Sequence, residues 1–165
     1  MDALVRPIIA LHELSSSILA TGIGDLTDQD AKARSRGGAG PSIAWTIGHL
    51  CHHKVTALAL LGQPRENAFA AQFEHTPATS GSDYPSLADL AASFSALDDD
   101  LCTALASSAD RLDAPMPGSG PHDEKRILDT VLFLTWHEAY HIGSIGAIRR
   151  EQGRKAIADL VRGHD

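Results

Sequence analysis

Two histidines four residues apart are the first candidates for chemistry in this chain of 165 residues. His137 and His141 lie in a stretch with helical periodicity, so their imidazoles project from one side of a helix, one turn apart. Rings at this spacing can share one metal ion, which would satisfy both polar groups in the interior. Alternatively, the two rings hydrogen-bond within the core or reach solvent at the end of the helix. The spacing alone leaves both interpretations open.

A second group of histidines, His49, His52 and His53, lies on an earlier helical stretch. If the two helices face each other, His49 completes a set of three imidazoles with His137 and His141. Three neutral imidazoles leave coordination positions open for water or substrate, which is typical of a reactive metal site. We expect His52 to face solvent or to lie beside the ligands without binding the ion, and His53 to support the ligands in the same way.

The segment HEAYH at 137–141 also matches the HExxH pattern of zinc proteases, in which the glutamate is the general base. The extended protease pattern fails, because Ser144 and Ala147 stand where glycine and histidine are required. We therefore reject a protease. We expect Glu138 to form an ion pair or to support the ligands, with a general base as the alternative, and no catalytic residue is assigned from the sequence.

The elements that must position these histidines are helices. Apolar residues recur at steps of three and four in four stretches, which cover residues 4–22, 42–61, 86–105 and 125–153. No segment alternates at period two, so the sequence predicts an all-α fold, a four-helix bundle in a single domain over residues 1–165. The long polar segment 25–40 allows a crossover connection. The run Asp98-Asp99-Asp100 touches the apolar stripe of its helix only at the edge, so we expect a solvated face.

Composition argues against several classes of partner. Lys and Arg number 14 against 21 Asp and Glu, a net charge of −7, which disfavours nucleic acid and anionic membranes. No apolar run is long enough to span a bilayer, and the N-terminal segment lacks the apolar core of a signal peptide. Cys51 and Cys102 form no disulfide framework, which favours a reducing compartment and a cytoplasmic location. We expect both to be packed thiols and not nucleophiles.

The two histidine motifs resemble those of a known family. The segment LFLTWHEAYHIGSIGAIRREQGRKAI at 132–157 resembles the last helix of the DinB-like superfamily, the DinB/YfiT-like metalloenzymes. SIAWTIGHL at 42–50 resembles the second helix of this family, and residues 84–105 are similar to its third. The resemblance implies a four-helix bundle that holds a divalent metal, often nickel or zinc. The implied ligands are His49, His137 and His141. Ser144, where many relatives have glutamine, is a departure that touches no ligand.

The resemblance also implies a range of functions. Some relatives are thiol-dependent S-transferases or isomerases, so the leading expectation is a metal-dependent S-transferase. It would use a low-molecular-weight thiol as co-substrate, act on a small molecule and hold the thiol as a thiolate on the metal. The alternatives are a metal-dependent hydrolase, which would use metal-bound water, and a metal-binding stress-response protein without turnover. Family members commonly form homodimers, which the resemblance suggests for this chain.

Overall fold

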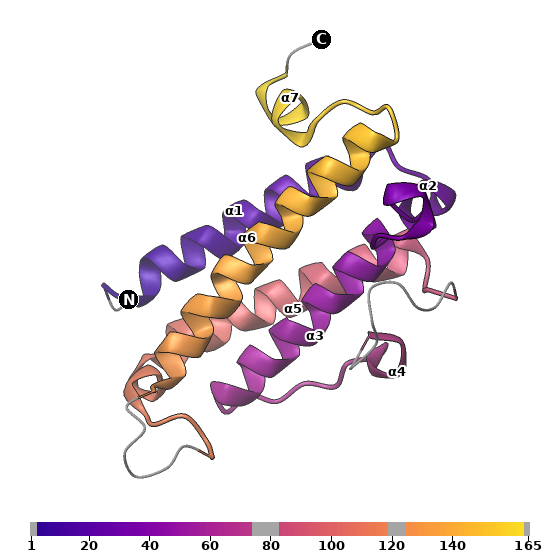
Figure 1. Ribbon diagram of the computed structural model, residues 1–165. Coiled ribbons are helices and arrows are strands. Elements are labelled where there is room, and N and C mark those ends of the chain that lie inside the picture. The colour runs from indigo at the N-terminus through magenta and orange to yellow at the C-terminus, as the bar shows by residue number, and fades with distance from the viewer. Residues whose placement is uncertain (1–2, 74–82, 119–124, 164–165) are drawn as a thin grey trace.

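The protein is described by a computed structural model that covers residues 3–73, 83–118 and 125–163. Its described residues form an all-helical bundle, which confirms the expected fold class (Figure 1). The four long helices are α1 (Val5–Ile23), α3 (Ile43–Leu60), α5 (Leu87–Ser107) and α6 (Ile127–Glu151). Shorter elements are α2 (Asp28–Lys32), α4 (Ala70–Phe73), α7 (Ile157–Arg162) and the 3-10 turns Arg36–Gly38 and Ala109–Asp113.

Local capping explains where the helices begin and end. The Ser42 hydroxyl accepts the backbone N–H of Trp45 at 3.1 Å, and the Ser86 hydroxyl accepts that of Asp89 at 3.0 Å. Both serines therefore satisfy amides that have no partner within the helix. Gly62 follows α3 with φ at +80°, a conformation that side chains other than glycine rarely adopt. These boundaries agree with the helices expected at 42–61 and 86–105.

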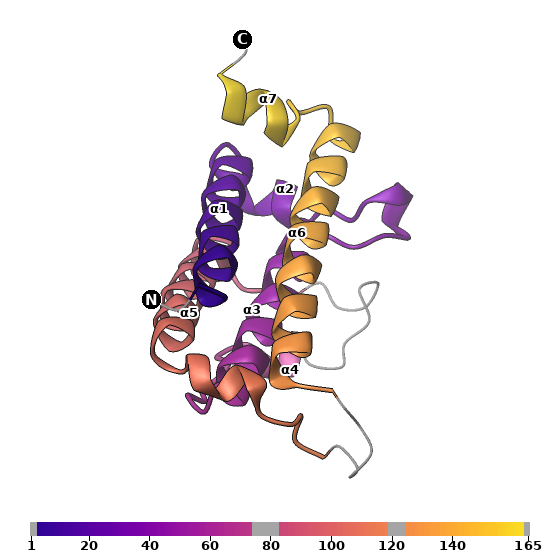
Figure 2. The same cartoon turned by 90° about the vertical axis from the view of Figure 1, so that its left-hand side faces the viewer.

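The order of the helices around the bundle sets which faces meet. α1 packs against α5 and α6, and α3 packs against the same two helices. Figure 2 shows α1 and α5 on one side of the bundle and α3 and α6 on the other. The successive helices α1 and α3 are therefore diagonal, so the segment that joins them crosses the bundle. This arrangement places the histidine-bearing helices α3 and α6 next to each other.

The short helix α7, which the sequence did not predict, is held against the ends of α1 and α6. Arg149 is fully buried, and its Nη1 donates to the Gly22 carbonyl and to Asp25 Oδ1, each at 2.6 Å. Ile157 of α7 packs on Gly22, where an added Cβ would lie 2.7 Å from the Ile157 Cδ1. None of the described helices combines the length and apolarity that a membrane-spanning helix needs.

Candidate metal centre

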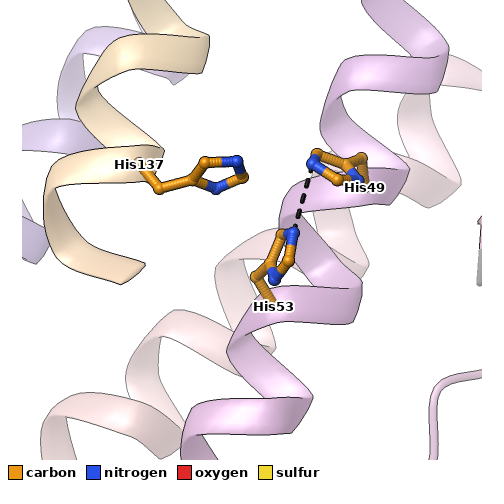
Figure 3. Close-up of side chains that lie close together, drawn as sticks. All are labelled: His49, His53 and His137. Atoms are coloured by element: carbon orange, nitrogen blue, oxygen red, sulfur yellow. Dashed lines mark hydrogen bonds between the residues drawn. The ribbon is translucent and has the colours of Figure 1, made fainter. Parts of the chain in front are cut away.

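Imidazoles from α3 and α6 gather at one level of the bundle. The Nε2 atoms of His49 and His53 lie 3.1 Å apart on α3, and those of His137 and His141 lie 3.0 Å apart on α6. Between the helices, the His49 ring centroid is 5.2 Å from that of His137 and 4.9 Å from that of His141. Figure 3 shows His137 reaching from its helix toward the His49–His53 pair. The structure thus brings together the three residues His49, His137 and His141.

The donor set fits a shared cation. One ligand atom from each of His49, His53 and His137 lies within 4.8 Å of the other two. Two nitrogens bound to the same ion at about 2.0–2.1 Å would be separated by about 2.8–3.4 Å, for angles at the ion between about 90° and 110°. The observed Nε2 pairs, at 3.1 and 3.0 Å, fall within that interval. The Nδ1 of His137 is buried with no hydrogen-bond partner in the described part of the chain, so the protein alone leaves this nitrogen unsatisfied.

The environment keeps these imidazoles neutral. Burial, reinforced by the neighbouring imidazoles, lowers the pKa of His49 to about 3. The same two causes lower the pKa of His53 and of His141 to about 4, and burial lowers that of His137. A neutral imidazole has the free lone pair that a metal ligand needs. The four rings are therefore available as ligands at neutral pH.

Aromatic side chains orient the histidine rings. Trp45 stacks on His49, with centroids 4.6 Å apart and planes 16° apart. Phe133 stacks on His137 at 5.7 Å, and its own side chain is 53% exposed. Trp45 thus packs on His49 from the core side, and His137 borders an exposed aromatic surface at Phe133.

The two remaining histidines of α3 lie close to the candidate ligands. His52 is half-buried, and its ring lies 5.5 Å from that of His53, so it does not simply face solvent. His53 presents its Nε2 to His49 and lies 4.5 Å, ring to ring, from His137, which makes it a candidate ligand. The assignment of His49, His137 and His141 as the ligands stays a prediction, with His53 as a fourth candidate.

Next to the histidines lies a buried charged cluster to which each long helix contributes one side chain. His12 comes from α1, Lys54 from α3, Asp98 from α5 and Glu138 from α6, and they are 3%, 2%, 4% and 3% exposed. The Lys54 ammonium donates to Asp98 Oδ1 at 2.5 Å and lies 2.6 Å from Glu138 Oε2. His12 Nδ1 lies 3.3 Å from Glu138 Oε1.

This cluster has two possible roles. The ligand atoms of His12, Asp98 and Glu138 lie close enough together to hold a metal ion. The Lys54 ammonium, however, already supplies a cation to both carboxylates. Burial raises the pKa of Glu138, but the hydrogen bond with His12 and the charge of Lys54 outweigh it and hold this pKa below its usual value. The ion pair expected for Glu138 is therefore present.

The structure corrects one expectation at this cluster, and it adds two residues that the sequence analysis did not identify. Asp98 does not lie on a solvated face: it is buried because Lys54 pairs with it, whereas the adjacent Asp99 is exposed. His12 and Lys54 were not identified from the sequence. A sequence feature that could have indicated their burial is the helical spacing: His12 lies one turn from Ile8, and Lys54 lies one turn from Leu58, and both apolar residues are buried.

Neither cysteine has the properties of a nucleophile. Cys51 and Cys102 are both free thiols. Burial raises the pKa of Cys51 to about 11 and that of Cys102 to about 12. Both therefore stay protonated at neutral pH and act as packed thiols, as expected.

Comparison with known proteins gives a family match. A family model described as the DinB superfamily matches residues 13–145, more than half of the chain. The matched region contains both histidine pairs, that of α3 and that of α6. No curated protein matches the chain.

Proposed function

This chain belongs to the DinB superfamily, and we propose that it is a metal-dependent enzyme with His49, His137 and His141 as its ligands. The observation that supports this best is the convergence of imidazoles from two helices, since the His49 ring centroid lies 5.2 Å from that of His137 and 4.9 Å from that of His141. We propose nickel or zinc as the ion, since both accept imidazole ligands.

The proposed reaction is the transfer of a low-molecular-weight thiol to a small electrophile. A bound ion would supply a coordination position on which a thiol loses its proton. The chain itself would hold the ion through neutral imidazoles. His53, which is neutral at pH 7 because burial lowers its pKa to about 4, would accept a hydrogen bond from the incoming thiol in the tautomer that leaves its Nε2 without a proton. The exposed face of Phe133 would contact the apolar part of the electrophile.

Metal content is the first test. Protein purified without a histidine tag should contain the ion in stoichiometric amount by inductively coupled plasma mass spectrometry. His137→Ala and His141→Ala should each lose it while keeping their helical content, because α6 retains its other core contacts. His53→Ala should keep the ion with an affinity lowered about 10–100-fold, as for residues that support ligands. If His53→Ala loses the ion and His141→Ala keeps it, the ligand set is instead His49, His53 and His137.

His52→Ala is the matched control, because it removes a half-buried imidazole of the same helix that is not proposed as a ligand. It should retain the full metal content. A loss equal to that of His137→Ala would mean that the assay reports helix damage and not ligand removal.

Activity is the second test. A panel of glutathione, bacillithiol and mycothiol with a chromogenic electrophile should give turnover in metal-loaded protein and none in His137→Ala. No rate above that of chelated protein with any of these thiols would refute the transferase. Hydrolysis of a chromogenic ester under the same conditions would favour a hydrolase, and stoichiometric metal without either rate would favour a non-catalytic metal-binding protein.

We also propose that the protein forms a homodimer through an apolar face of α6. Leu132, Trp136 and Tyr140 recur every four residues along this helix and are 44%, 61% and 59% exposed. Three large apolar side chains on one exposed helix face are typical of an interaction surface. A cytoplasmic location is proposed as well, and the two free thiols support it.

A further inference from the structure

A groove between α1, α6 and α7 lies apart from both clusters. Its volume is about 710 Å³, within the range of roughly 300–1,000 Å³ that is typical of small-molecule sites. Neither the four gathered imidazoles nor the buried charged cluster lines it. Its lining residues come from α1, α6, α7 and the segment before α7, and they include Ile18, Gly143, Arg150, Ile157, Val161 and Arg162.

Small residues on α6 keep the groove open, and buried contacts hold its far wall in place. A Cβ added at Gly143 would meet no atom within 4 Å, so the space beside this glycine is free. The opposite wall, α7, is fixed by the packing of Ile157 on Gly22 and by the hydrogen bond from Arg149 Nε to the Lys155 carbonyl at 3.2 Å. The groove is thus a pre-formed feature of the fold.

The lining chemistry selects the type of ligand. Among the lining residues, the only charged side chains are Arg150 and Arg162, and none is acidic. In a chain of net charge −7, two guanidinium groups beside an apolar groove favour a ligand with an anionic end, because a guanidinium binds a carboxylate through two parallel hydrogen bonds. None of the lining residues is aromatic, so the groove offers contact surface to an alkyl chain and no ring to stack on.

We propose that this groove binds a single-chain fatty carboxylate. The alkyl chain would lie along the small residues of α6, opposite Ile157 and Val161. The carboxylate would pair with Arg150. Each methylene buried in the groove should tighten binding about fourfold, until the chain fills the space between the helices. This site is independent of the metal site, so chelation should leave its affinity unchanged.

The test is displacement of a dansyl-labelled fatty acid by straight-chain carboxylates from octanoate to octadecanoate, each below its micelle-forming concentration. Affinity should rise with chain length and then level off. Gly143→Leu, which fills the groove, should weaken binding at least tenfold. Arg150→Gln should weaken binding of the carboxylate about tenfold, but not binding of the primary alcohol of the same length.

Matched controls keep these results interpretable. Ala106→Leu adds the same side chain at an exposed position of α5, and Arg6→Gln removes an exposed charge from α1; both should bind as the unmodified protein does. Gly143→Leu replaces a glycine inside a helix, which favours the helix, and circular dichroism checks its fold.

Several results would overturn the proposal. They are unchanged binding in Gly143→Leu, equal affinity for carboxylate and alcohol in the unmodified protein, or affinity that rises with chain length without levelling. Binding only to anionic phospholipid vesicles would assign the groove to a membrane surface. Self-association abolished by Gly143→Leu, without fatty acid binding, would assign it to a second copy of the chain.

Discussion

Replacing Lys54 by methionine should destabilise the protein strongly. The side chain is 2% exposed and its ammonium contacts the carboxylates of Asp98 at 2.5 Å and of Glu138 at 2.6 Å. Methionine has a similar volume, so the substitution removes the charge and leaves the packing nearly intact. Two buried carboxylates would then lack their cation. Removing one partner of a buried ion pair costs about 3–5 kcal/mol, and we expect the free energy of unfolding to fall by that amount.

Urea unfolding at pH 7, followed by circular dichroism with a chelator present, measures this loss. The chelator matters because His12, Asp98 and Glu138 could hold a metal ion in the place of the ammonium. Lys54→Met combined with Asp98→Leu should recover part of the loss, since it removes a carboxylate together with the ammonium.

The matched control is Lys32→Met, which breaks a solvent-accessible pair with Asp28 at 3.6 Å, whose two side chains are 34% and 51% exposed. Exposed pairs contribute about 0–1 kcal/mol, so this variant should unfold nearly as the unmodified protein does. A loss below about 1 kcal/mol in Lys54→Met would show that the buried cluster behaves like a surface ion pair and would refute the reasoning.

Three further perturbations test other parts of the structure. Chelated protein should lose stability as pH falls from about 6.5 to 4. The reason is that His49 and His53 have folded pKa values of about 3 and about 4, so the unfolded chain takes up protons first. Urea midpoints that stay constant over this pH range, or a midpoint that depends on pH as steeply in His49→Ala as in the unmodified protein, would contradict it. Gly48→Ala should cost about 1–3 kcal/mol in thermal unfolding, because its Cβ would lie 2.2–2.4 Å from ring atoms of Phe73, and Phe73→Leu should relieve the clash. Trp136→Glu should convert the proposed dimer to a monomer in sedimentation velocity, and an unchanged sedimentation coefficient would place the interface elsewhere.

Helical periodicity was sufficient to predict the four long helices. Each has enough turns for its apolar stripe to stand out, as Leu90, Phe94, Leu97 and Leu101 do on α5. The helix α7 has only six residues, too few for a periodic pattern. It forms where Ile157 docks on Gly22, a contact between segments far apart in the chain that a local pattern does not contain.

The site residues, like α7, could be predicted from the sequence only where the pattern lies within single helices. The approach of His49 to His137 and His141 followed from spacing along two helices that turned out to be neighbours. The burial of Asp98 could not be predicted in the same way, because a charged residue next to two other acidic residues is expected to face solvent. Its charge is compensated in the interior by Lys54, which reaches it from another helix. Such partners become visible once the order of the helices around the bundle is known.

The charged cluster and the imidazoles require the same alignment of α3 against α6. Lys54 directly follows His53, and Glu138 directly follows His137, so each helix carries one residue of each cluster at the same turn. A shift of α3 by one turn, about 5.4 Å, would separate Lys54 from Glu138 and would also carry His53 away from His137. A cavity of about 10 Å³ lined by His53, Lys54 and Glu138 shows that the two clusters are contiguous. Because buried charges without partners are far more costly than misplaced apolar side chains, an alignment that separates Lys54 from Glu138 is strongly disfavoured, and the alignment that pairs them is also the one in which the imidazoles of α3 and α6 meet.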